Sequence, residues 1–356
     1  MIVKNVHSQN NIGKIGEIYM NIIFYDFRDS EKNFFKHNVY EDFDIKFVKE
    51  PLNSFTEVTE FDSRETCVIS VFTTSRIDLE VLDKFKNLRL ITTRSTGFDH
   101  IDIDECAKRN IAVVNVEQYG KVSVTEYTIG MIIALVRKLV PAVRDMRRQD
   151  IKRDKYLGRD LAELRLGVVG TGAIGSSVAA VANTLGMKIY AYDLSKNKEI
   201  EAIVEYVDFE TLLKNSDIIT LHVPYNKESY HIISSYELSI MKHGAYLINT
   251  ARGELIDTVA LYDAIANNKL AGCALDVQEC EGVLLNMSKD PVQSVERADK
   301  TCIQRAMILQ KLAESDKVII TPHIAYNTLD AVNTILDTTF GSIRDYLKGL
   351  NTNRVI

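Results

Sequence analysis

Residues 166–180, LGVVGTGAIGSSVAA, contain the glycine pattern Gly170-x-Gly172-x-x-Gly175 between a short apolar strand and a helix of small residues. In such a turn the first glycine permits a tight bend, and the second lets a pyrophosphate approach the backbone. The third lets the helix pack close to the sheet, and the free N–H groups at the helix N-terminus bind phosphate. This stretch therefore predicts a dinucleotide-binding turn.

The next strand, KIYAYD at 188–193, ends in Asp193, 23 residues after Gly170. A carboxylate at this place accepts hydrogen bonds from the adenosine ribose hydroxyls and repels a 2′-phosphate. Lys196 and Lys198 follow closely and oppose that repulsion. The pattern still favours NAD over NADP.

Strand-length apolar runs recur around this turn, which indicates a doubly wound parallel sheet of six strands. The runs are LGVVG, KIYAYD, DIITLHV at 217–223, AYLINT at 245–250, AGCALDV at 271–277 and KVIIT at 317–321. Helical patterns near 174–185, 209–215, 233–241 and 258–268 separate them.

A second alternating series comes earlier in the chain and predicts another parallel sheet. It begins at Met20 and continues with strands at 67–72, 88–93 and 111–116 and helices at 77–87 and 102–109. Residues 1–19 show no clear period and are predicted to be an extension. A long helix at about 122–139 joins the two series, and a final helix is predicted at 328–349.

Length and composition limit the classes of protein. A chain of 356 residues predicts two domains, and a net charge of −6 gives no reason to expect a nucleic-acid or membrane partner. The basic stretch 136–155 interleaves charged and apolar residues, which favours a solvated helix face or a subunit contact. Residues 167–187 carry no charge but include five glycines, so a membrane span is not predicted.

The number of cysteines is odd, and no pair has CxxC spacing; they are Cys67, Cys106, Cys273, Cys280 and Cys302. The pattern predicts neither a disulfide framework nor a zinc site. We expect free thiols, no metal and a cytoplasmic location.

Four polar residues follow the ends of predicted strands, at the edge where doubly wound sheets bind ligands. Arg252 comes just after AYLINT, Asp276 lies near the end of AGCALDV, Glu281 lies in the next loop, and His323 comes just after KVIIT. Taken singly, each has a structural explanation: a surface ion pair, a loop cap, a solvated acid and a core histidine. Their shared position beside the glycine turn favours a functional site.

Together these side chains fit hydride transfer at a carbon that bears oxygen beside a carboxylate. Arg252 is suited to bind the carboxylate bidentately. His323 is suited to exchange a proton with the reacting oxygen, and Glu281 to favour and orient the protonated imidazole. The cofactor carries the hydride.

From about Met20 onward the chain resembles the D-isomer-specific 2-hydroxyacid dehydrogenases. The matching motifs are GVVGTGAIG, LHVP, LINTARGELID, ALDVQECE, TPHIAY and TTRSTGFDHID. The resemblance implies that Arg252 binds substrate, that His323 is the acid/base and that Glu281 pairs with it. It also implies that Thr96, Gly97 and Tyr119 contact the substrate carboxylate.

The glycine turn and the resemblance together predict a set of cofactor contacts, with Asp276 at the nicotinamide end. The set is Gly170, Gly172, Ala173, Ile174, Gly175, Asp193, Val223, Pro224, Thr250, Ala251 and Asp276.

The resemblance implies an α/β fold with two Rossmann-like doubly wound domains and an active-site cleft between them. The expected substrate domain is 20–118 plus 327–356, and the expected NAD-binding domain is 119–326, through which the protein would form a homodimer. Two features depart from the family: Glu117 and the YGK text at Tyr119, and a long segment at 282–317.

The predicted function is an NAD-dependent D-2-hydroxyacid dehydrogenase, with pyruvate and D-lactate as the leading substrate pair. One alternative is a larger 2-oxo acid such as 2-oxoisocaproate or phenylpyruvate. Another is an NAD-sensing corepressor-like protein, in which binding of other proteins matters more than turnover.

Overall fold

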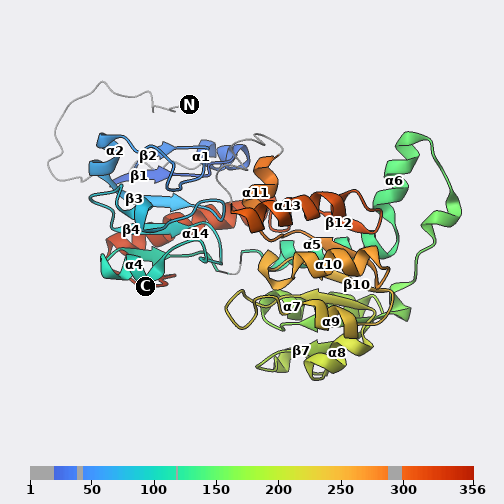
Figure 1. Ribbon diagram of the computed structural model, residues 1–356. Helices are drawn as coiled ribbons and strands as arrows, with labels where there is room; N and C mark the ends of the chain where they lie inside the picture. The colour runs from blue at the N-terminus through green and yellow to red at the C-terminus, as the bar shows by residue number, and fades with distance from the viewer. Residues whose placement is uncertain (1–19, 38–42, 118, 288–298) are drawn as a thin grey trace. The chain divides into compact units, whose positions relative to one another are not determined.

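A computed structural model describes residues 20–37, 43–117, 119–287 and 299–356. The predicted extension at 1–19 lies outside the described residues. The chain divides into two compact units (Figure 1), one formed by the residues up to Tyr119 together with Thr328–Ile356, the other by Gly120–Asn327. We call them unit 1 and unit 2 and describe each by itself.

Unit 1 contains a five-stranded sheet in which all paired strands are parallel. Its order is β2 (Phe43–Phe47), β1 (Met20–Phe24), β3 (Thr66–Val71), β4 (Leu90–Thr93) and β5 (Ala112–Val114). The pattern of apolar runs misses β2, because only alternate residues of that strand are apolar and its burial alternates in the same way.

Helices cover both faces of this sheet. On one face lies α14 (Leu329–Leu347), whose Val332, Leu336 and Phe340 pack against the strands. On the other lie α3 (Leu79–Leu82) and α4 (Ile103–Lys108), which are shorter than the helices predicted at 77–87 and 102–109. The other helices among the described residues of this unit are η1 (Asp29–Glu31), α1 (Lys32–His37) and α2 (Glu60–Glu65).

Unit 2 contains a seven-stranded parallel sheet with the doubly wound order expected for dinucleotide binding. The order is β12 (Val318–Ile320), β11 (Leu270–Leu275), β10 (Ala245–Asn249), β9 (Ile218–Leu221), β6 (Arg165–Val169), β7 (Lys188–Tyr192) and β8 (Glu205–Tyr206). The predicted fold class is confirmed. The seventh strand, β8, escaped prediction because two residues carry no periodic signal.

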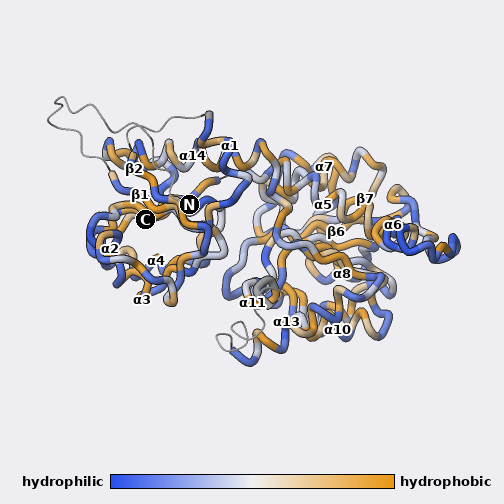
Figure 2. Tube along the Cα trace, turned by 90° about the horizontal axis from the view of Figure 1, so that it is seen from above, coloured by the Kyte–Doolittle hydropathy of each residue, from blue (hydrophilic) through white to orange (hydrophobic). Residues whose placement is uncertain are grey.

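Two helical layers enclose this sheet and bury its apolar strands, and β6 is mostly hydrophobic in Figure 2. One layer holds α5 (Lys121–Val136) and α7 (Ala173–Thr184). The other holds α8 (Phe209–Asn215), α9 (Ser235–Ile240), α10 (Thr258–Ala266) and α13 (Lys300–Ala313). Short helices η2 (Arg153–Tyr156), η3 (Leu161–Glu163) and η4 (Lys198–Ile200) lie in the connections.

The helix predicted at 122–139 is too long. In the structure α5 ends at Val136, Lys138 adopts a left-handed conformation with φ of 52°, and α6 (Leu139–Arg148) begins. Pro141 falls in the first turn of α6, where its missing N–H is not needed. Across the described residues, no helix is both long and apolar enough to cross a membrane.

Candidate active site

The glycine turn between β6 and α7 has a separate physical reason for each glycine. Gly170 has φ of +92°, and a Cβ there would lie 2.7 Å from the carbonyl oxygen of His222. A Cβ at Gly175 would lie 1.9 Å from the carbonyl oxygen of Gly170. At Gly172, the N-cap of α7, a Cβ would have no neighbour within 4 Å. The turn therefore keeps open space at the one glycine expected to face a pyrophosphate, which fits a bound dinucleotide.

Asp193 directly follows β7 and braces this turn. One carboxylate oxygen accepts from the Thr171 N–H at 2.5 Å and from its hydroxyl at 3.1 Å, and the other accepts from the Ser195 N–H at 3.0 Å. Burial acts to raise the pKa of the Asp193 carboxyl, but these donors outweigh it, and the net pKa lies below the ordinary value. The carboxylate is thus charged at neutral pH, as the predicted selection against a 2′-phosphate requires.

The other predicted cofactor contacts also follow strand ends of unit 2. Val223 and Pro224 lie just beyond β9, and Thr250 and Ala251 lie just beyond β10. The Thr250 hydroxyl is 2.9 Å from that of Thr128 on α5, which fixes its side chain. Their contacts with the cofactor stay predictions.

Arg252 is the N-cap of a short helix, η5 (Gly253–Leu255), and is half-buried. Its Nη1 donates to the carbonyl oxygen of Ala251 at 2.8 Å. The next residue, Gly253, packs so tightly that a Cβ would lie 2.1 Å from the carbonyl carbon of Gln278. This close approach sets the Arg252 loop against the segment that runs from Asp276 to Glu281.

His323 and Glu281, 42 residues apart, meet in the structure. The His323 Nδ1 lies 3.1 Å and 3.2 Å from the two carboxylate oxygens of Glu281, the first residue of α11 (Glu281–Met287). The two side chains are 24% and 20% exposed, so the pair is partly shielded and still accessible. A carboxylate in this position stabilises the protonated ring.

Asp276 shapes the loop that carries His323. It is fully buried, and its carboxylate accepts from the Thr321 hydroxyl at 2.5 Å and from the N–H groups of Ile324 and Ala325 at 3.0 and 2.8 Å. Its carbonyl oxygen accepts from the His323 N–H at 2.8 Å. These bonds hold His323 in a left-handed conformation with φ of 54°. Contact of Asp276 with the nicotinamide stays a prediction.

The predicted carboxylate-binding residues Thr96, Gly97 and Tyr119 belong to unit 1. The loop after β4 is fixed by hydrogen bonds from the Thr96 hydroxyl to the Val116 carbonyl oxygen at 3.0 Å and from the Ser95 hydroxyl to the Gly97 carbonyl oxygen at 2.6 Å. Tyr119 is the last residue of unit 1 before the chain enters unit 2.

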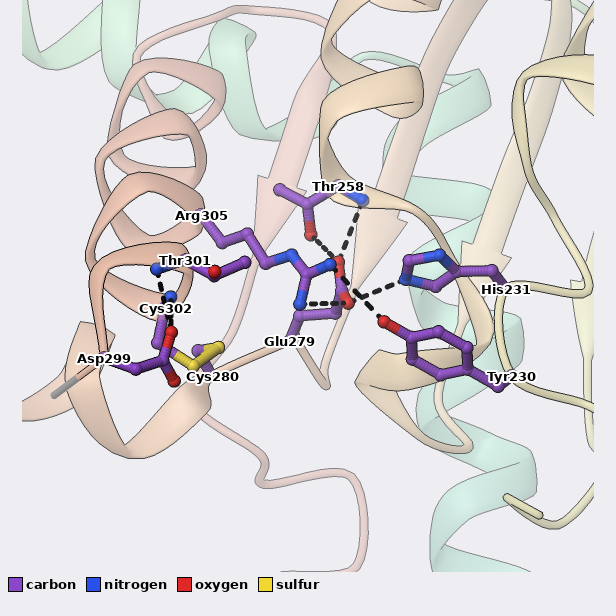
Figure 3. The surroundings of a disulfide bond; sticks show 9 residues. All are labelled: Tyr230, His231, Thr258, Glu279, Cys280, Asp299, Thr301, Cys302 and Arg305. Atoms are coloured by element: carbon purple, nitrogen blue, oxygen red, sulfur yellow. Dashed lines mark hydrogen bonds and ion pairs between the residues drawn. A yellow bond between two sulfur atoms is a disulfide. The ribbon is translucent and has the colours of Figure 1, made fainter. Parts of the chain in front are cut away.

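Two features beside this site were not predicted. The expectation of five free thiols is wrong for Cys280 and Cys302, which form a disulfide (Figure 3). No sequence pattern indicated this bond, because the two cysteines are 22 residues apart and α13, which was not predicted, brings them together. Cys67, Cys106 and Cys273 are free. No cluster of potential metal ligands occurs within the described ranges.

The second unpredicted feature is a buried polar cluster around Glu279, whose side chain is 2% exposed. His231, Thr258 and Arg305 point toward this carboxylate from three directions in Figure 3. The sequence QECE could have indicated this cluster, because it places a second acid, Glu279, two residues before Glu281, the partner of His323.

Comparison with known proteins decides the family. The model of the D-isomer specific 2-hydroxyacid dehydrogenase NAD-binding domain matches residues 129–325. The chain belongs to this family. It is 39% identical to a D-specific alpha-keto acid dehydrogenase of Enterococcus faecium over 78% of this chain and 82% of that protein. It is 34% identical to an aromatic 2-oxoacid reductase of Clostridium sporogenes over 80% of this chain and 85% of the relative.

A solved structure agrees along nearly the whole length. D-lactate dehydrogenase from Aquifex aeolicus, in complex with NAD and lactic acid, matches with a TM-score of 0.83 and 36% identity, covering 94% of this chain and 99% of that one. The chain is an NAD-dependent 2-hydroxyacid dehydrogenase, as predicted from the glycine turn, the polar residues at the strand ends and the family resemblance.

Proposed function

We propose that this dehydrogenase reduces pyruvate to D-lactate with NADH. The observation that carries the proposal is the His323–Glu281 pair, held at 3.1 Å beyond the carboxyl ends of β11 and β12 beside the loop that presents Arg252. An acid/base and a fork-shaped cation in one loop cluster are what reduction of a 2-oxo acid needs.

Each side chain has a distinct task in this reaction. Arg252 binds the substrate carboxylate through two parallel N–H bonds. Because Glu281 occupies Nδ1 of His323, the other ring nitrogen, Nε2, donates the proton to the carbonyl oxygen. Bound NADH supplies the hydride, and the charge on Glu281 favours the imidazolium form that gives its proton to the oxygen.

Residues of unit 1 are proposed, by the family resemblance, to contact the substrate carboxylate. The loop at Thr96 and Gly97 offers backbone N–H groups to the substrate carboxylate, and Tyr119 offers its hydroxyl. The bonds that fix this loop to the Val116 carbonyl support a preformed anion site, because a fixed loop loses little entropy when substrate binds.

Substrate size distinguishes pyruvate from its alternatives. The solved structure with lactic acid supports a small substrate, whereas the aromatic 2-oxoacid reductase supports a large one. Initial rates of NADH oxidation with glyoxylate, pyruvate, 2-oxobutyrate, 2-oxoisocaproate and phenylpyruvate test the proposal. We expect the highest kcat/KM with pyruvate and D-lactate as the product on chiral analysis. A tenfold preference for 2-oxoisocaproate or phenylpyruvate would assign the enzyme to the larger acids.

A corepressor-like role predicts stable protein partners and little turnover. The joint presence of Arg252, Glu281 and His323 favours catalysis. The same substrate panel, run beside a pull-down with and without NADH, separates the catalytic from the corepressor hypothesis. A corepressor would capture protein partners in an NADH-dependent way and would not oxidise NADH.

We also propose that the enzyme forms a homodimer through unit 2. The helix α6 projects from the body of that unit (Figure 1) and exposes four large apolar side chains. These are Leu139, Val140, Val143 and Met146, which are 48% to 64% exposed. A second copy is the partner that the predicted assembly requires. Light scattering should give the mass of a dimer, and Val143→Glu with Met146→Glu should give a monomer.

A further inference from the structure

The Cys280–Cys302 disulfide lies immediately beside the proposed acid/base pair. Cys280 precedes Glu281 in the chain, and Cys302 lies in the first turn of α13. The two Cα atoms are 5.3 Å apart, within the usual range for a disulfide. Cys280 has φ of 55°, a left-handed conformation that a residue with a side chain rarely adopts. The structure must therefore hold this residue in place.

An ion pair also connects the segment before Glu281 to α13. Glu279 accepts from the Thr258 hydroxyl at 2.6 Å and pairs with Arg305 at 3.2 Å and with His231 at 2.8 Å (Figure 3). Arg305 and Cys302 are three residues apart on α13 and so lie on one side of that helix. The helix thus fixes residues 279 and 280, directly before Glu281, at two adjacent points.

We propose that the Cys280–Cys302 disulfide positions the Glu281 carboxylate against His323, and that a dithiol which reduces it lowers the rate of proton transfer. This inference rests on the proposed acid/base role of the pair. The physical basis is the geometry of Glu281, because small displacements in a catalytic constellation change rates strongly. With the bond cut, the left-handed conformation at Cys280 loses one of its constraints, and α11 begins from a less fixed position.

The exchange reaction is complete with one dithiol molecule. A thiolate of the dithiol attacks one sulfur of the disulfide, and the Cys280–Cys302 bond breaks to give a mixed disulfide and one protein thiolate. The second thiol of the dithiol displaces the other protein sulfur and closes its own disulfide. Two electrons and two protons pass to Cys280 and Cys302, and the dithiol is oxidised.

Access and reactivity favour this pair over the buried cysteines. Both members of the disulfide are half-buried, so a reductant can reach them. Burial raises the pKa of Cys106 to about 11 and that of Cys273 to about 12, which keeps those thiols protonated and unreactive. Cys67 is half-buried and lies in unit 1, so it serves as a control.

Among the described residues, several titratable groups surround the two contact points. In the part of the chain that the structure describes, Glu281, the buried Asp276 beneath its loop and the Tyr326 ring at 6.3 Å face His323. Behind the disulfide, His231 faces Glu279, lies 4.0 Å from Asp257 and stacks on Tyr230. The test must therefore observe His323 separately from His231.

The first measurement is an NMR titration of ring-labelled histidines in the full chain, with His323 and His231 assigned from their Ala and Gln variants. In the oxidised enzyme we expect His323 to stay protonated to higher pH than in enzyme reduced with dithiothreitol. Cys302→Ser should follow the reduced curve with or without dithiothreitol, and Cys67→Ser should respond as the unmodified protein does. In Glu281→Gln the two curves should superimpose, because the carboxylate through which the disulfide acts is gone.

The kinetic counterpart is kcat/KM for reduction of the 2-oxo acid, measured at a pH high enough that this value has begun to fall. Cleavage of the disulfide by dithiothreitol should lower this kcat/KM by roughly threefold to tenfold, which is a part of what a positioned acid contributes. The KM for NADH should stay unchanged. Superimposed His323 titrations of the oxidised and reduced enzyme would overturn the inference, as would five titratable thiols before any reductant is added. The absence of turnover with every 2-oxo acid would instead overturn the proposed function, and the NMR titration would still decide the role of the disulfide.

Discussion

The glycine turn and the acid/base loops lie at the same edge of one sheet but are built in opposite ways. In the turn, Gly170 and Gly175 are required because a Cβ at either position would meet a backbone carbonyl oxygen, that of His222 or that of Gly170. In the acid/base loops, Cys280 and His323 adopt left-handed conformations although both carry side chains. Contacts from distant parts of the chain hold them there, including the Asp276 carboxylate and the disulfide to Cys302.

This difference shows which part of the site tolerates change. A turn defined by backbone contacts either forms or fails, because a Cβ cannot share space with a carbonyl oxygen. Loops held by side-chain bonds can shift by fractions of an ångström without unfolding. We therefore expect the cofactor turn to respond to substitution through stability and binding, and the acid/base loops to respond through rate and pH.

The largest effect should come from the acid/base itself. His323→Ala removes the proton donor and should lower kcat by roughly 10²–10⁴-fold, the usual contribution of a positioned acid. The affinity for NADH, measured by fluorescence titration, should change little, because the glycine turn is untouched. A variant that retains more than a tenth of the activity would remove His323 from the mechanism.

Arg252 should have the next largest effect. Arg252→Lys keeps the charge but loses the planar fork, so kcat/KM for the 2-oxo acid should fall by about 10- to 100-fold, with KM rising and kcat falling. NADH binding is the internal control and should not change. Unaltered kinetics with the 2-oxo acid would show that Arg252 has only a structural role.

Two alanine substitutions in the turn separate packing from binding. Gly175→Ala places a methyl group 1.9 Å from the Gly170 carbonyl oxygen and should lower the free energy of unfolding by about 1–3 kcal/mol. The matched variant Gly172→Ala meets no neighbour within 4 Å, so it should keep its stability and lose affinity for NADH. Denaturant unfolding and NADH titration of both variants provide the check. Equal destabilisation by the two would contradict the distinct roles given to these glycines.

The smallest effect concerns the choice of cofactor. Because the donors around Asp193 keep it charged, NADH should be used at least about tenfold better than NADPH, or about 1.4 kcal/mol. Asp193→Asn should narrow this ratio, although it also disturbs the bonds to Thr171 and Ser195. Comparable kcat/KM with both cofactors in the unmodified enzyme would exclude Asp193 as the selecting group.

The sequence was sufficient for those parts of the fold whose cause is local. The glycine turn, six strands of the unit 2 sheet and the strand-end positions of Arg252, Glu281 and His323 follow from motifs and apolar runs. The break between α5 and α6 was missed because the apolar pattern continues across it, and only the left-handed Lys138 marks it. The disulfide and the bonds of Asp276 to Ile324 and Ala325 depend on tertiary contacts, which no local pattern encodes.

The central claim is that Glu281 acts through His323, and the pH dependence of reductive kcat/KM tests it most directly. Burial lowers the pKa of His222 to about 3, so the titration of that histidine does not change kcat/KM near neutral pH. Reduction needs the protonated ring, so kcat/KM should be flat at low pH and fall as pH rises through the titration of His323. In Glu281→Gln the ring loses its stabilising charge, and the falling limb should move to lower pH while measurable activity remains. If the Glu281→Gln profile superimposes on that of the unmodified enzyme, the pair is not the acid/base unit.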